Sequence, residues 1–248
     1  NTTFAVLVHL LIFLTVEYCT TKKMNSGGTP AVTTRRFTKH KYPNSNANYE
    51  GYVDTAGHRD GQGTYVDKKG NKYIGQWKND KSHGYGVKKF ATGDIHEGYY
   101  VNDKRHGWGM YTWKNGDKYV GLWVNGLMHG EGTFFWAHGD TYQGTFRNGN
   151  MEGRGLKRLA DGGVYDGDWL SNKTEGRGMK KFPAGDTHRG FYASDTRQGF
   201  GFYTWPNGDH FVGTWSSGTM AGRGSKVMAN GDSYFGEWKD DKADGLGK

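Results

Sequence analysis

The sequence predicts an all-β fold: an elongated single-sheet solenoid of consecutive 23-residue β-hairpins, with an apolar, helical segment at the N-terminus. The first observation behind this prediction is the composition, because the 248 residues include 42 glycines, only 4 prolines and 15% aromatic residues. This combination is typical of short strands joined by tight turns, and it differs from the composition of collagen and of disordered chains. The other two observations are a strict sequence period and an alternation of residue types within it.

The period is 23 residues long and is most regular from Tyr73 onward. Residues 49–72 fit as an earlier repeat with one inserted residue, so eight full repeats precede a partial ninth at 234–248. The chain therefore divides into an apolar anchor or signal-like segment at 1–19, a basic linker at 20–48 and a repeat region at 49–248. The regular repeats begin at Tyr73, His96, Tyr119, Tyr142, Tyr165, His188, Phe211 and Tyr234.

The first half of each regular repeat has an aromatic residue or His at position one, Gly at position three and an aromatic residue at position five. These alternate positions share one face of a strand, and the glycine leaves room for the two rings to lie across the backbone. Examples of the motif are Tyr73, Gly75 and Trp77; Tyr119, Gly121 and Trp123; and Tyr165, Gly167 and Trp169.

The second half has Gly at positions twelve and fourteen and closes with turn residues such as Asn115-Gly116-Asp117. Each repeat therefore predicts one β-hairpin. Consecutive hairpins that pair edge to edge would align their aromatic rows into a continuous strip. The glycine pairs include Gly84 and Gly86, Gly130 and Gly132, and Gly176 and Gly178.

A longer period is also present, because residues 73–95 resemble residues 165–187, four repeats later. The two repeats that begin with histidine, at His96 and His188, are related in the same way. This pattern indicates duplication of a four-repeat block. Since both histidines replace an aromatic residue, we expect them to be packed rings.

The repeat resembles the membrane occupation and recognition nexus (MORN) repeat, on residues such as Tyr73, Gly75 and Trp77 followed by Gly84 and Gly86. The resemblance implies a β-hairpin solenoid that organises other molecules. Known settings of the family are scaffolds near membranes, ciliary radial-spoke heads, junctions between membranes, and accessory regions of some lipid kinases and lysine methyltransferases. The family pattern supplies no catalytic residue.

The N-terminal segment is strongly apolar between Phe4 and Val16. Residues 2–18 reach the lower length limit of a membrane-spanning helix. Four interpretations remain open: a membrane anchor, a cleavable signal or targeting sequence, a helix buried in a partner, or translated sequence ahead of a start at Met24. In the anchor interpretation, the basic segment that follows would place the repeats on the cytoplasmic, stromal or matrix side of the membrane.

Basic residues mark candidate contacts for anionic phospholipid or an acidic protein partner. One group falls at positions thirteen and seventeen of the repeats, with the parity opposite to that of the aromatic row. The alternative is a solvated face that keeps the protein soluble. The candidates are Arg154, Arg158, Arg177, Lys181 and Arg223 in the repeats, and Lys22, Lys23, Arg35 and Arg36 in the linker.

Several function classes are not expected. The sequence has no phosphate-binding loop, His-Glu-x-x-His, Gly-x-Ser-x-Gly or dinucleotide-binding motif, so we predict no enzyme activity, no catalytic residue and no cofactor. A single cysteine, Cys19, excludes an intramolecular disulfide, and His83, His106 and His129 recur too far apart to share one metal ion. The net charge of +8 comes mainly from the linker, so the repeats do not predict nucleic-acid binding.

The sequence therefore predicts a non-catalytic structural scaffold that organises protein subunits of a larger, membrane-associated assembly. One alternative is a soluble structural component of the ciliary or flagellar axoneme, similar to a radial-spoke head. A second is a regulatory repeat region of a longer enzyme, for which the mass of the full-length polypeptide would be decisive.

Overall fold

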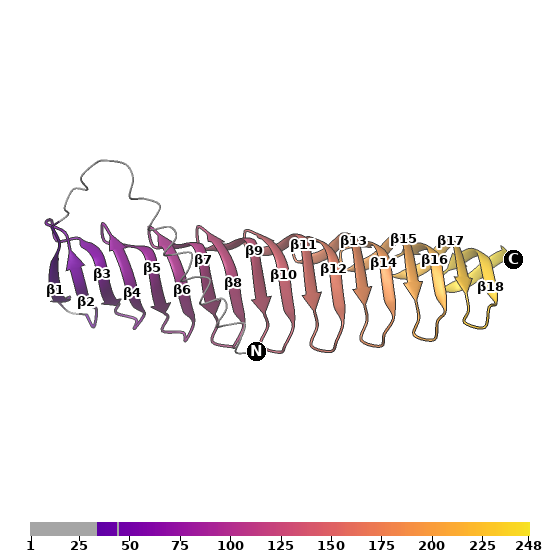
Figure 1. Ribbon diagram of the computed structural model, residues 1–248, viewed down its shortest axis with the longest axis horizontal. Helices are drawn as coiled ribbons and strands as arrows, with labels where there is room; N and C mark the ends of the chain where they lie inside the picture. The colour runs from indigo at the N-terminus through magenta and orange to yellow at the C-terminus, as the bar shows by residue number, and fades with distance from the viewer. Residues whose placement is uncertain (1–33, 44) are drawn as a thin grey trace, which may run out of the picture. The chain divides into compact units, whose positions relative to one another are not determined.

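The computed structural model describes residues 34–43 and 45–248. The repeats belong to one compact unit, Arg35–Lys248, and the predicted N-terminal apolar segment lies outside the described residues. The unit contains nineteen strands, and each pairs antiparallel with its neighbours in the sequence (Figure 1). The single sheet of consecutive hairpins is therefore confirmed.

The strands are β1 (Arg36–Lys41), β2 (Asn48–Val53), β3 (Arg59–Val66), β4 (Lys72–Lys78), β5 (Lys81–Lys89), β6 (Ile95–Val101), β7 (Lys104–Thr112), β8 (Lys118–Val124), β9 (Leu127–Phe135), β10 (Thr141–Arg147), β11 (Asn150–Arg158), β12 (Val164–Leu170), β13 (Lys173–Lys181), β14 (Thr187–Ala193), β15 (Thr196–Thr204), β16 (His210–Ser216), β17 (Thr219–Val227), β18 (Ser233–Lys239) and β19 (Lys242–Gly247).

Two kinds of turn connect the strands. Within a repeat the turn is tight: between β4 and β5 both central residues, Asn79 and Asp80, have positive φ angles of 48° and 64°. Positive φ at both positions matches the twist of the flanking strands and favours Asn, Asp and Gly. Between repeats the turn is wider, as where Phe90 N donates to Asp94 O at 2.9 Å.

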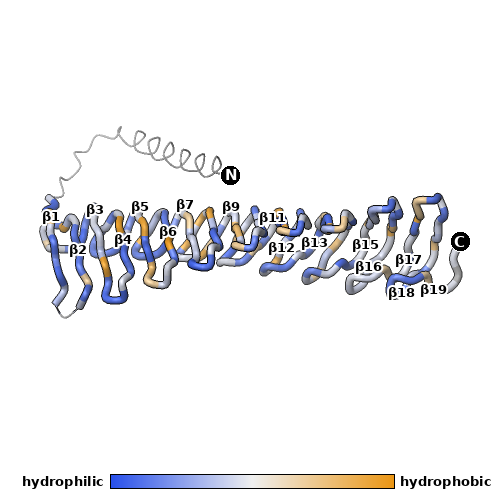
Figure 2. The backbone as a smooth tube through the Cα atoms, turned by 90° about the horizontal axis from the view of Figure 1, so that it is seen from below, coloured by the Kyte–Doolittle hydropathy of each residue, from blue (hydrophilic) through white to orange (hydrophobic). Residues whose placement is uncertain are grey.

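In Figure 2, hydrophobic segments recur along the strands from β3 to β11.

Each full hairpin contains a β-bulge that the repeat pattern did not reveal. Between β4 and β5 the pairing passes from Gly75 opposite Gly86 to Trp77 opposite Ser82, so Gln76 faces a longer stretch of β5. Gly84 lies in this stretch with a φ of 83°, a left-handed conformation that glycine adopts without strain. The side-chain oxygen of Gln76 accepts a hydrogen bond from Tyr85 N at 3.0 Å, which satisfies a backbone group that the bulge leaves unpaired.

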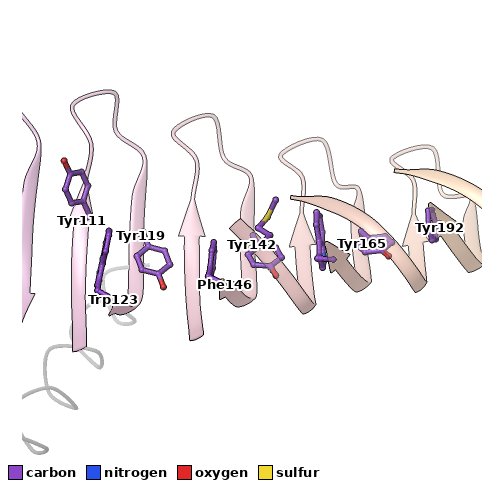
Figure 3. Close-up of a cluster of buried hydrophobic side chains, with 9 residues drawn as sticks. Tyr111, Tyr119, Trp123, Tyr142, Phe146, Tyr165 and Tyr192 are labelled. Carbon is purple, nitrogen blue, oxygen red and sulfur yellow. The ribbon is translucent and has the colours of Figure 1, made fainter. Parts of the chain in front are cut away.

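The core is the predicted strip of aromatic rings. Tyr119 is fully buried and packs edge-on against Trp123 in its own repeat and Phe146 in the next, with ring centroids 5.1 and 5.0 Å apart (Figure 3). A Cβ atom at Gly132 would overlap the Tyr119 ring, which confirms that the glycines make room for the rings. Edge-to-face packing is a favourable arrangement of aromatic side chains.

The sheet begins before the first repeat. Strand β1 pairs with β2 along its whole length, from Arg36 opposite Val53 to Lys41 opposite Asn48. It lies within residues 20–48, which we predicted as a linker. Its side chains are mostly exposed and carry none of the glycine and aromatic spacing that marks the repeats.

Candidate interaction surfaces

The sheet has two faces with different side chains. The aromatic face carries the buried residues at positions one and five, such as Tyr119 and Trp123. We call the opposite side the outer face; it carries the side chains at positions two, four, thirteen and fifteen. A position-thirteen residue lies opposite a position-four residue of the next repeat, as Trp108 does with Leu122. The outer face therefore presents a column of dissimilar side chains, one from each repeat.

The predicted basic residue Arg154 lies on the outer face next to two acids. Its guanidinium group forms ion pairs with Asp166 and Asp168, each at 3.4 Å. Arg154 is opposite Asp168 across the strand pair, and its side chain is 66% exposed. Because water screens such surface pairs, each contributes at most about 1 kcal/mol to stability. The charge of Arg154 is compensated within its own sheet.

Two other predicted arginines also have partners on the outer face. The Arg177 guanidinium lies over the Phe191 ring, 5.2 Å from its centroid. Arg223 forms an ion pair with Glu237 at 3.1 Å and lies opposite it on the neighbouring strand. In the column, each of these arginines faces a side chain of the following repeat.

Arg158 and Lys181 form an exposed positive cluster on the sheet. Arg158 on β11 and Lys181 on β13 both pair with Val164 on β12, one on each side. Both side chains are exposed, and within residues 34–43 and 45–248 neither takes part in an ion pair. Arg154 and Arg177 lie on the same two strands, but the Asp168 carboxylate is between them, since it pairs with the Arg154 guanidinium and accepts a hydrogen bond from Arg177 N at 2.9 Å.

Of the predicted basic residues of the linker, two lie outside the described residues and two lie within them. Lys22 and Lys23 lie outside the described residues. Arg35 forms an ion pair with Asp60 at 2.6 Å, and Arg36 is exposed at the start of β1. Arg35 therefore fixes the start of the sheet to β3.

The histidines at position one are packed rings, as predicted. His96 is fully buried, and its Nδ1 lies 2.6 Å from the Tyr100 hydroxyl. Burial, and secondarily the charge of Arg105, lowers the pKa of His96 to about 3. Burial, and secondarily Arg197, lowers the pKa of His188 to about 4. Both rings are therefore neutral structural parts of the core.

The arginines beside these histidines stack on the core rings. The Arg105 guanidinium lies 4.3 Å from the Trp123 ring centroid and donates to Gly126 O at 2.8 Å. Arg197 lies 4.1 Å from the Trp215 ring centroid and donates to Gly218 O. Cation–π contact and a backbone acceptor together let a charged group cover the core.

Exposed apolar residues on the outer face were not predicted from the sequence. Trp108 is 51% exposed and Phe200 is 62% exposed. Both occupy position thirteen, four repeats apart. The sequence did contain a signal for them: both are large apolar residues at a position whose side chain lies on the face opposite to the aromatic row.

The described residues offer no evident small-molecule site. They contain no group of three or more His, Cys, Asp or Glu side chains arranged to hold a metal ion. One cavity of about 200 Å³, lined in part by Lys180, Tyr192 and Arg197, is smaller than the roughly 300–1,000 Å³ of typical ligand pockets. No helix in the part of the chain that the structure describes is long and apolar enough to cross a bilayer.

The family model of the MORN repeat matches the whole repeat region. Comparison with curated proteins found no match. Among solved structures, the chain is similar to the wild-type TCP10 domain of Danio rerio CPAP, which is 12% identical, with a TM-score of 0.44 over 82% of this chain and 94% of that one. Another is the SAS-4 (dCPAP) TCP domain of Drosophila melanogaster, solved with a proline-rich motif of Ana2 (dSTIL); it is 14% identical, with a TM-score of 0.30 over 88% of this chain and 97% of that one. The matched repeats are residues 49–72, 73–95, 96–118, 119–141, 142–164, 165–187, 188–210, 211–233 and 234–248.

Proposed function

Because this chain belongs to the MORN-repeat family, we propose that it is a non-catalytic structural scaffold that holds together protein subunits of a larger, membrane-associated assembly. MORN repeats are generally protein-interaction modules. The proposed mechanism is geometric: a row of hairpins presents contact points to its partners at a constant spacing.

The observation that carries this proposal is the linkage between neighbouring repeats. At the tight turns, Ser82 N donates to the Asp103 carboxylate at 2.7 Å, and Asp103 N donates back to Ser82 O at 3.0 Å. At the wide turns, Ala137 N donates to the Asp117 carboxylate of the preceding repeat at 2.7 Å. Neighbouring repeats are thus linked by side chains at both kinds of turn, in addition to the pairing of their strands. Such links favour a stiff row over a flexible chain of modules.

The membrane part of the proposal has two supports. One is the apolar sequence between Phe4 and Val16. The other is the exposed pair Arg158 and Lys181, whose charges can contact lipid phosphates. Arg154 and Arg223 contribute less to this proposal than the sequence suggested, because neighbouring carboxylates compensate them.

The scaffold proposal is tested by solubilising the native membrane fraction in mild detergent, separating intact complexes and identifying the co-migrating proteins by mass spectrometry. Co-migration with integral membrane subunits is the expected result. Co-migration with axonemal or other soluble structural proteins, unchanged when detergent is omitted, would support the axonemal alternative instead.

The lipid contact is tested by liposome flotation of the double variant Arg158→Glu/Lys181→Glu. We expect weaker binding to vesicles that contain phosphatidylserine and no change with neutral phosphatidylcholine vesicles. The matched control is Lys104→Glu/Lys118→Glu, which reverses two exposed charges elsewhere on the sheet. Equal binding by the wild type and both double variants would remove this basic pair from the lipid contact.

A further inference from the structure

The position-thirteen residues of the outer face form a column that is complementary to itself when reversed. Read outward from Arg154, the first residues on the two sides are Glu131 and Arg177, which carry opposite charges. The next two are the exposed aromatic residues Trp108 and Phe200. In the described residues the column comprises Gln62, the equivalent residue of the first repeat, followed by Tyr85, Trp108, Glu131, Arg154, Arg177, Phe200 and Arg223.

From this arrangement we propose that two copies of the chain associate through their outer faces, in antiparallel order, around a two-fold axis at Arg154. A two-fold interface uses the same patch on both copies, so each contact occurs twice. An axis that runs along the strand at Arg154 places Trp108 on Phe200 of the second copy and Glu131 on its Arg177. This association goes beyond the proposed function and does not rest on it, because a scaffold can also act as a single chain.

The charges close to the axis are compatible with this contact. Arg154 would meet its own copy, but each Arg154 carries the carboxylates of Asp166 and Asp168. Arg158 lies on the same strand four residues farther along, outside a strip five residues wide centred on position thirteen. The flanking Glu131 is exposed and accepts a hydrogen bond only from the neutral Thr145 hydroxyl, at 3.1 Å, among the described residues. Arg177 has the Phe191 ring as its neighbour. Within residues 34–43 and 45–248, therefore, neither member of the proposed ion pair has an opposite side-chain charge as its partner.

The apolar residues supply the surface that such a contact would bury. On β7 and β8, Trp108 lies opposite Leu122. On β14 and β15, Phe191 and Phe202 are each 40% exposed beside the more exposed Phe200. Large exposed apolar patches bounded by polar residues are typical of protein interaction sites.

The size of the face is sufficient for a stable pair of chains. Trp108 and Phe200 lie on β7 and β15, eight strand spacings apart, which is roughly 38 Å at the usual interstrand distance. A strip of this length and about five residues wide covers roughly 600–700 Å² on each copy, close to the ~800 Å² of a standard protein interface. A bilayer would not select for Glu131 between the apolar patches, so a second copy fits the position-thirteen column better than lipid does. The proposed lipid contacts Arg158 and Lys181 lie at position seventeen, beside the column and closer to the wide turns.

Charge reversal at the proposed ion pair gives a direct test. Glu131 and Arg177 lie on β9 and β13, roughly 19 Å apart in one sheet, so they form no pair within the chain. Glu131→Arg would oppose two arginines twice in the dimer, and Arg177→Glu would oppose two glutamates twice. We expect native mass spectrometry of the full chain, released from mild detergent, to show a wild-type dimer and a dissociation constant raised at least about tenfold in either variant.

Mixing the two variants distinguishes a lost contact from a damaged fold. In a heterodimer of Glu131→Arg with Arg177→Glu, both ion pairs are restored, so the mixture should dimerise when neither variant does so alone. Lys239→Glu, at an exposed position on β18, is the control and should dimerise like the wild type. A monomeric wild-type chain, dimers that survive either single reversal, or a mixture without heterodimers would each overturn the proposal.

Discussion

The carboxylate of Asp117 accepts a hydrogen bond from the backbone nitrogen of Ala137, twenty residues later, at 2.7 Å. The same bond joins Asp94 to Lys114 at 2.8 Å and Asp209 to Ala229 at 2.9 Å. The last residue of one wide turn therefore holds the wide turn of the next repeat. At two of the wide turns the donor position is a proline, which has no N–H group: Pro183 follows Gly163, and Pro206 follows Asp186.

Asp117→Ala should lower the free energy of unfolding by about 1–2 kcal/mol, because Ala137 N loses a charged acceptor. Urea denaturation followed by far-ultraviolet circular dichroism measures the change. The matched control is Asp232→Ala, since Asp232 makes the same bonds with Asn230 within its own turn, whereas the described part of the next repeat, residues 234–248, does not reach the position equivalent to Ala137. Equal losses in the two variants would show that the bond between repeats contributes little.

Gly132→Ala should destabilise the protein strongly, by roughly 3 kcal/mol or more, because the new Cβ atom would overlap the buried Tyr119 ring. The control Gly126→Ala meets no atom within 4 Å, but its φ is 89°, so it should cost only about 1 kcal/mol of backbone strain. Thermal denaturation of the two variants compares them. A Gly132→Ala variant as stable as Gly126→Ala would contradict the close packing of ring on glycine.

Acid should destabilise the protein partly through His96 and His188, whose folded-state pKa values are lowered to about 3 and about 4. The unfolded chain binds these protons from about pH 6.5 downward, while the folded chain does not, so stability is full above that pH and falls as the pH decreases. Each histidine contributes a slope of about 1.4 kcal/mol per pH unit between pH 6 and its folded pKa.

His96→Phe checks this contribution, because Phe211 shows that phenylalanine fits the same position of another repeat. Urea midpoints measured from pH 7 to pH 4 should fall less steeply in the variant than in the wild type. The carboxylates that titrate in this range are common to both proteins, so the difference between the two slopes isolates His96. Parallel slopes would mean that His96 is protonated in the folded state.

Arg105→Met should raise the pKa of His96, because the positive charge of Arg105 is one cause of its lowering. Methionine occupies the same repeat position at Met128, Met151 and Met220, so the core can accommodate it. Titration of the His96 ring by nuclear magnetic resonance measures the shift. The His188 signal is the internal control, because that ring lies beside Arg197 instead. A change of equal size at both rings would indicate a global loosening of the sheet.

The repeat unit and its aromatic row could be predicted from the sequence because both depend on neighbours a few residues apart. Tyr119, Gly121 and Trp123 share a strand face in any register, since alternate side chains of a strand always do. The turn residues Asn115, Gly116 and Asp117 likewise act locally. The burial of Tyr119 and Trp123 confirms this reading.

Features without a local signal were not predicted. Strand β1 is recognisable only by its pairing with β2, because its own residues lack the repeat spacing. The bulge opposite Gln76 depends on how two strands align, and two glycines at Gly84 and Gly86 look equivalent in the sequence although only Gly84 has a positive φ.

The surface chemistry depended most on tertiary structure. The sequence alone determined that Arg154, Arg177 and Arg223 share the strand face opposite to the aromatic row. Only the pairing of successive hairpins decided that Asp168 lies opposite Arg154 and Glu237 opposite Arg223. The physical reason is that side-chain parity follows from the two-residue period of one strand, whereas the partner across the sheet follows from the register between strands, which the turns and bulges set.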